Sequence, residues 1–131
     1  MFSPVSSLLM SASLAWTMVV VAALARSRAI SIAGLRAAMG NRDDLPEPSG
    51  FASRADRAAR NMLENLVLFG TVLLAASMAR VPAGDLAIPC AIFVGSRVVH
   101  ALLYWGGVRY VRTVAWAVSL LGMAWIGALA A

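Results

Sequence analysis

A chain of 131 residues with 61% hydrophobic and only 13% charged residues is too apolar for a soluble domain, in which about half of the residues are apolar. The formal net charge is +5, but the basic residues, all of them arginine, flank or enter hydrophobic segments instead of forming a solvated basic domain. This distribution argues against nucleic-acid binding. The composition therefore indicates an integral membrane protein.

The first apolar segment, residues 5–25, carries no charge and is long enough to cross about 30 Å of hydrocarbon. Small residues recur every four positions at Ser7, Ser11 and Ala15, and such a stripe favours close packing of helices. The segment follows no positively charged N-terminal region. We therefore expect a retained membrane helix and not a cleaved signal peptide.

Residues 26–56 form the longest polar stretch, and Gly40, Pro46 and Pro48 are expected to interrupt any helix within it. This pattern predicts a solvent-facing loop. Ser53 followed by Asp56 resembles a capping box in which Asp replaces the usual Glu. The second helix is therefore expected to begin just before residue 57 and to span residues 57–78.

The remaining apolar segments predict two further spans. Residues 81–85, with the sequence Val-Pro-Ala-Gly-Asp, indicate a tight turn, and the third span follows over residues 86–106. Gly106 and Gly107 end this span, and the fourth covers residues 110–131. The predicted fold is an all-α integral membrane protein, a bundle of four transmembrane helices that forms one domain over residues 1–131.

Arginines near the span ends predict the orientation in the membrane. With four spans, both termini lie on the same side of the membrane, and only Arg80 lies on that side. The opposite side, which holds the other arginines near span ends, is therefore expected to be cytoplasmic, and both termini are expected outside. The connections after the first and third spans hold Arg26, Arg28, Arg36, Arg42, Arg54, Arg57, Arg109 and Arg112.

Two spans carry polar side chains at helical spacing near their cytoplasmic ends. Arg57, Asn61 and Glu64 share one face of the second span, because steps of three and four residues return to nearly the same side of a helix. The third span has a second set of polar residues at the same helical spacing. Arg112 enters the membrane at the same depth from the fourth span. Ionisable groups within a span are costly unless they pair or bind a ligand, so they indicate a functional site. The second set consists of Arg97, His100 and Tyr104.

The mixture of guanidinium, carboxylate, amide, imidazole and phenol groups suits a small zwitterionic or multiply anionic ligand. Arginines would bind carboxylates, Glu64 would bind an ammonium group, and Asn61 would offer both a donor and an acceptor to peptide groups. A tripeptide such as glutathione fits this description. Alternatives are that Glu64 only neutralises an arginine, that His100 is a hydrogen-bonded structural residue, and that Tyr104 anchors the interface. No metal is expected, because no second His or Cys lies near His100.

Three segments resemble the MAPEG family, the membrane-associated proteins in eicosanoid and glutathione metabolism. Residues 57–64, Arg-Ala-Ala-Arg-Asn-Met-Leu-Glu, resemble the second-helix motif of that family. Residues 40–44, Gly-Asn-Arg-Asp-Asp, resemble its first-loop segment. Residues 97–104, Arg-Val-Val-His-Ala-Leu-Leu-Tyr, are similar to the third-helix motif of its prostaglandin E synthase members. The resemblance covers nearly the whole chain.

The resemblance implies a homotrimer that binds glutathione between neighbouring subunits. Arg112 matches the arginine that stabilises the thiolate, and Thr113 stands beside it where the prostaglandin enzyme has serine. Trp116 occupies an aromatic contact position, and either Arg26 or Arg28 is the contribution of the first helix. Arg57 and Arg97 complete the candidate set because of their place in the two polar clusters. Glutathione itself would be held by Arg60, Asn61, Glu64, His100 and Tyr104.

The function expected from this resemblance is that of a glutathione transferase or peroxidase acting on a lipophilic electrophile in the membrane. The expected location is a bacterial inner membrane, with the site in its cytoplasmic half. One alternative is a non-catalytic trimeric membrane protein of the same fold. Another is a small four-helix transporter, although such transporters typically carry a titratable acid in the first span and this chain has none there.

Overall fold

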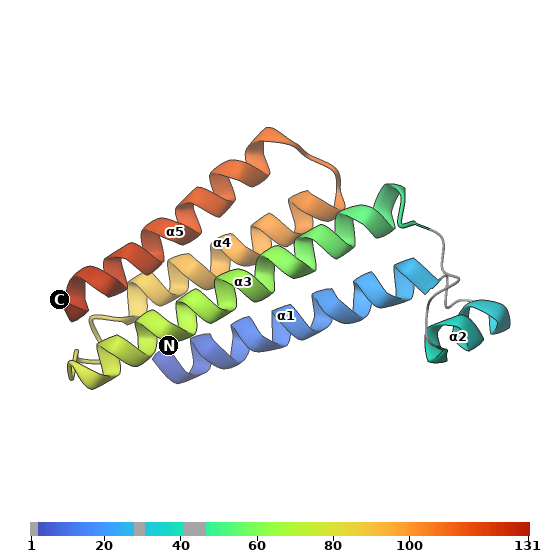
Figure 1. The fold of residues 1–131 in the computed structure, drawn as a ribbon. Helices are drawn as coiled ribbons and strands as arrows, with labels where there is room; N and C mark the ends of the chain where they lie inside the picture. Colours follow the sequence, from blue (N-terminus) through green and yellow to red (C-terminus); the bar gives the residue numbers. More distant parts are fainter. Residues whose placement is uncertain (1–2, 28–30, 41–46) are drawn as a thin grey trace.

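The structure, a computed structural model, describes residues 3–27, 31–40 and 47–131, and this part of the chain is helical with short turns. Four of its helices are long and apolar enough to cross a membrane, as the sequence predicted. A short fifth helix, α2, contacts α1 and lies outside the bundle (Figure 1). The helices are α1 (Pro4–Ser27), α2 (Ile32–Met39), α3 (Gly50–Met78), α4 (Ala87–Trp105) and α5 (Tyr110–Ala130).

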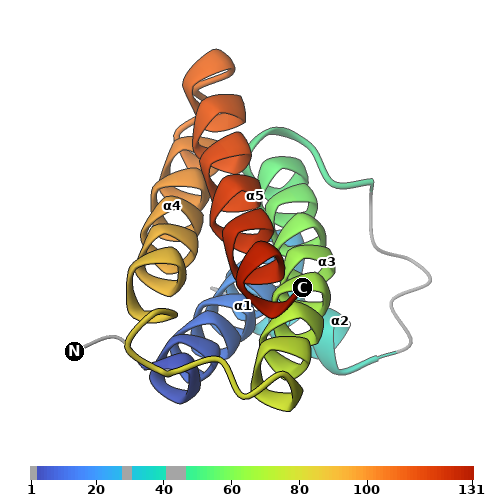
Figure 2. The same cartoon turned by 90° about the vertical axis from the view of Figure 1, so that its left-hand side faces the viewer.

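The long helices pack mainly as two pairs, α1 with α3 and α4 with α5. The pairs are joined by contacts of α3 with α4 and α5 and of α1 with α4, and Figure 2 shows α5 between α4 and α3. The last turn of α1 and the first turn of α3 lie at one end of this bundle, with the turn between α4 and α5 (Figure 1). We call it the arginine end, and its members are Arg26, Arg54, Arg57, Arg109 and Arg112.

The expected start of the second span near Arg57 is wrong, because α3 begins at Gly50. Ser49 is its extended N-cap, directly after Pro48. Ser53 and Asp56 lie inside the helix, where each bonds to an arginine one turn later instead of capping backbone N–H groups. A serine and an acidic residue three positions apart can therefore also each pair with an arginine four residues later within a helix, as Ser53 and Asp56 do.

The expectation of a continuous loop over residues 26–56 is also wrong. Helix α1 continues to Ser27, and α2 forms within the connection. The Ser31 side-chain oxygen caps α2 by accepting a hydrogen bond from the Gly34 backbone N–H at 3.0 Å. Such a cap offsets part of the cost of starting a short helix.

The core of the half away from the arginine end is built around aromatic stacking and one close backbone contact. The Phe69 and Phe93 rings stack with centroids 3.9 Å apart. A Cβ atom added at Gly122 would lie 2.9 Å from the Pro89 carbonyl oxygen, so glycine permits the close approach of α5 to α4. This half fixes the two helices that carry most of the candidate site.

The core of the half at the arginine end consists mainly of alanines around Met18 and Met62. The predicted stripe of Ser7, Ser11 and Ala15 extends from the first turn of α1, at the other end of the bundle, to the middle of that helix. It is buried within the chain, with 0–2% of each residue exposed. Small side chains here allow close packing of α1 inside the bundle. The stripe is therefore used within one subunit.

The turn between α4 and α5 is held against the start of α3. Gly107 adopts a φ of +77°, a left-handed conformation that favours glycine. The Arg54 Nε donates a hydrogen bond to the Trp105 carbonyl oxygen at 3.3 Å. This contact fixes the place at which α5 begins, and with it the position of Arg112.

Candidate functional site

A cavity of about 140 Å³ opens at the arginine end between α3, α4 and α5. The turn at Gly106 and Gly107 brings the last turns of α4 beside the first turns of α5, so side chains from both helices face it. All of its lining residues belong to the set predicted from the sequence. They are Asn61 of α3, His100 and Tyr104 of α4, and Arg112, Thr113 and Trp116 of α5.

The aromatic and cationic groups of the cavity are ordered by contacts with one another. The Arg112 guanidinium carbon lies 4.3 Å from the centroid of the Tyr104 ring, a cation–π contact. The His100 and Tyr104 rings meet edge to face, with centroids 5.4 Å apart. His100 is buried, and its Nδ1 has no hydrogen-bond partner among the described residues.

The polar groups that the described residues contribute to the cavity include no carboxylate. A guanidinium, an imidazole, an amide and hydroxyl groups converge there, and most of these can donate hydrogen bonds. Such an arrangement favours an anion, because charge-assisted hydrogen bonds are stronger than neutral ones.

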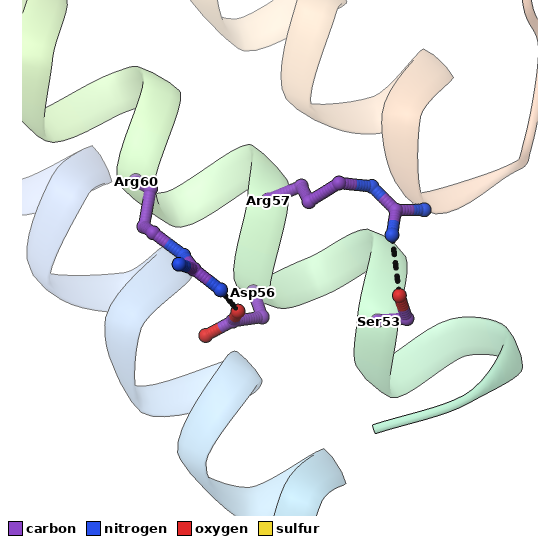
Figure 3. A network of polar contacts seen from close by, with 4 residues as sticks. All are labelled: Ser53, Asp56, Arg57 and Arg60. Carbon is purple, nitrogen blue, oxygen red and sulfur yellow. Dashed lines mark hydrogen bonds and ion pairs between the residues drawn. The ribbon is translucent and has the colours of Figure 1, made fainter. Parts of the chain in front are cut away.

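A second hollow, an open groove of about 470 Å³, runs along the other polar residues of α3. Arg57, Arg60 and Glu64 are exposed there. Arg60 pairs with Asp56 and Arg57 donates to Ser53, and the two arginines extend to opposite sides of α3 (Figure 3). The groove is lined by Glu47, Pro48, Ser53, Asp56, Arg57, Arg60, Asn61 and Glu64.

Glu64 forms no ion pair with the described residues, because the carboxylate that Arg60 contacts is that of Asp56. Among the described residues, Glu64 therefore neutralises no arginine. Glu64 remains free to bind a cation in the groove, beside exposed guanidinium groups that bind anions. The groove thus suits a zwitterion.

Asn61 lines both the cavity and the groove, so the two hollows meet at its side chain. Arg97 lies behind this junction and lines neither hollow. Its Nη2 donates to the Asn61 Oδ1 at 2.9 Å, and its Nε lies 3.3 Å from the Met62 Sδ. Sequence spacing indicated Arg97 but held no signal for its contact with the methionine sulfur.

The arginine contributed by the first helix lies apart from the cavity. Arg26 lines a groove of about 220 Å³ between α1 and α3, together with Asp56 and Arg60. Arg28 lies outside the described residues, as do residues 41–44 of the first-loop segment. Among the predicted glutathione ligands, the structure thus places Arg26 beside Arg60 in this groove.

Asp56 is a site residue that the sequence interpretation assigned to a helix cap. Its spacing of four from Arg60 was the signal that could have identified the pair. Among the residues that the structure describes, no group of three or more His, Cys, Asp or Glu side chains could hold a metal ion.

Comparison with known proteins gives one match. Residues 6–131, nearly the whole chain, match the sequence model of the MAPEG family. Neither the curated proteins nor the solved structures include one that matches the chain.

Proposed function

The chain belongs to the MAPEG family, and on this premise we propose that it is a glutathione-dependent membrane enzyme of the transferase or peroxidase type. The family includes glutathione-dependent enzymes. One observation carries the proposal: the cavity and the groove meet at Asn61. The described residues of the cavity include Arg112, His100 and Tyr104 and no carboxylate, whereas the groove has both arginine and carboxylate side chains.

Glutathione matches this division of charge. Its carboxylates and its ammonium group suit the groove, where Arg57 and Arg60 lie near Glu64. Its thiol, which becomes an anion on activation, suits the cavity. The tripeptide would therefore lie across the junction at Asn61, with its charged ends over α3 and its sulfur toward α5.

Activation of the thiol is assigned to Arg112. A free thiol has a pKa of about 8.5 and is mostly protonated at neutral pH. A guanidinium in a site of low dielectric lowers that pKa by favouring the thiolate, and the Thr113 hydroxyl can donate a further hydrogen bond. The thiol proton leaves to water. The sulfur then uses its electron pair to form a bond to carbon, and a leaving group such as halide departs with the electrons of the broken bond.

The second substrate in this proposal is a lipophilic electrophile that arrives through the bilayer. Val111 and Val114 on α5 are exposed beside the cavity residues Arg112 and Thr113, so the outer face of this helix is apolar where it borders the site. An apolar molecule dissolved in lipid would approach the sulfur from this side. Trp116 would contribute an apolar wall.

The enzyme would be a homotrimer in a bacterial inner membrane, with the arginine end in the cytoplasm and both termini outside. The basis for this orientation is that Arg80 is the one arginine of the described residues at the opposite end.

The proposal is tested by replacing Arg112 in the purified protein. Arg112→Ala should remove the ultraviolet absorbance of bound thiolate and lower the turnover of an aromatic halide by about 100-fold, while much of the glutathione affinity remains. Arg109→Ala is the matched control, because Arg109 is exposed near the start of α5 and lines no part of the cavity. Full thiolate absorbance and turnover in Arg112→Ala would overturn the assignment.

A further inference from the structure

Arg97 is the largest fully buried side chain of the described residues, with 1% of its surface exposed. It lies within the membrane-spanning helix α4, yet no described carboxylate pairs with it. A buried cation without a counter-ion destabilises a protein unless its other contacts compensate. Its presence therefore calls for a role other than stability.

The contacts of Arg97 determine how the Asn61 amide is turned. A guanidinium group can only donate hydrogen bonds, so the atom of Asn61 that faces Arg97 at 2.9 Å must be the oxygen Oδ1. The Nδ2 of Asn61 makes no hydrogen bond with the described residues and is not among their buried unpaired atoms. The amide therefore presents its NH₂ group where Asn61 lines the cavity and the groove.

We infer that Arg97 is a positioning residue that makes Asn61 a hydrogen-bond donor to the ligand. The group that this NH₂ binds at the junction is then an acceptor, such as a carboxylate or a peptide carbonyl. The donor role is one of the two that the sequence predicts for Asn61, and the contact with Arg97 favours it. The inference rests on the proposed function, because the ligand that it concerns is glutathione.

The first test separates positioning from a structural role. Arg97→Met removes the donor and the buried charge, so the thermal midpoint without ligand should stay the same or rise. The dissociation constant for glutathione, obtained from the midpoint as a function of ligand concentration, should increase about tenfold or more. Arg97→Lys retains a donor to Oδ1 and should restore most of the affinity. Arg109→Met removes the charge of an exposed arginine and should bind like the wild-type protein.

A double-mutant cycle shows whether Arg97 acts through Asn61. Asn61→Ala should weaken glutathione binding, and adding Arg97→Met to it should weaken binding little further, because the group that Arg97 positions is already absent. Losses that add in the double variant would mean that Arg97 acts independently of Asn61. That result would overturn the inference.

The remaining outcomes distinguish the inference from the proposed function. A wild-type protein that binds no glutathione at millimolar concentration would overturn both. Tight binding by both the wild-type protein and Arg97→Met would overturn the inference alone. Should Arg97→Met fail to fold, Asn61→Asp tests the same point, since it keeps an acceptor for Arg97 and removes the NH₂ donor. Full glutathione affinity in Asn61→Asp would refute the positioning role.

Discussion

Arginines of this chain serve different purposes according to their depth and partners. Arg112 stacks on the Tyr104 ring at the cavity wall, whereas Arg97 is buried behind that wall against Asn61. Arg54 instead fastens the turn between α4 and α5. Each of these side chains carries the same charge, so the partner and the exposure of the guanidinium group decide whether it can reach a ligand.

Glu64 is expected to affect binding more than chemistry. It is exposed and forms no ion pair with the described residues, so Glu64→Gln should leave the thermal midpoint without ligand unchanged. In the proposed complex it contacts the ammonium group equally in the ground and transition states. Its loss should therefore raise the apparent Michaelis constant for glutathione about tenfold and change turnover little.

Steady-state kinetics over a range of glutathione concentrations check this expectation. Asp85→Asn is the matched control, because it removes one carboxylate at the end of the bundle away from the site. A loss of turnover at an unchanged Michaelis constant would show instead that Glu64 takes part in the chemical step.

Residue spacing predicted which side chains of the site share a helix face, but not what lies opposite them. His100 and Tyr104 are one turn apart on α4 and both line the cavity. Arg97 belongs to the same predicted set and yet packs toward Asn61 and Met62 of α3. A helical period fixes the direction of a side chain relative to its own axis, whereas its neighbour depends on how two helices cross.

At the scale of helices, hydropathy predicted the four spans, because about 20 consecutive apolar residues have few alternatives to a membrane helix. The polar segments were less predictable. The pattern of Ser53 and Asp56 indicated a cap but forms contacts within α3, and α2 was missed because eight residues carry too short a pattern. Local polar signals fit several structures, and tertiary packing selects one of them.

Two glycines of α5 provide a paired test of helix packing. At Gly122 an added Cβ would meet the Pro89 carbonyl oxygen at 2.9 Å and the Phe93 backbone nitrogen at 3.2 Å, so α4 would have to move. Gly122→Ala should destabilise the protein by about 1–3 kcal/mol. At Gly127 nothing lies within 4 Å, so Gly127→Ala should be neutral or stabilise by up to about 1 kcal/mol through helix propensity.

Thermal midpoints of both variants in the same detergent measure this difference. Both variants replace glycine by alanine in the same helix. A lower midpoint for Gly122→Ala and an equal or higher midpoint for Gly127→Ala would therefore show the effect of the close approach of α5 to α4 alone. A midpoint for Gly122→Ala at or above that of Gly127→Ala would contradict the packing described here.

At the scale of the whole molecule, most of the arginines gather at one end of the bundle, and the proposed site at that end is open on one side. Among the described residues, the groove is lined by α3 and by Glu47 and Pro48, and no other described helix forms an outer wall. Arg57, Arg60 and Glu64 would consequently leave a bound tripeptide largely exposed to solvent or lipid. A neighbouring copy packed against α3 would supply the missing wall.

The resemblance to the MAPEG family predicts a homotrimer, and subunits of such a trimer could enclose a ligand in the open groove. Native mass spectrometry in a mild detergent should give three times the chain mass of 13.7 kDa. Glutathione should be retained on the trimer and lost when collisional activation releases a subunit, because one chain leaves the groove open. Gly127→Ala is the control, because nothing lies within 4 Å of the added methyl group. It should give the same assembly mass and the same retention of glutathione as the wild-type protein. A monomer or dimer that retains glutathione as well as the intact assembly would show that one chain, or two, suffices for the site.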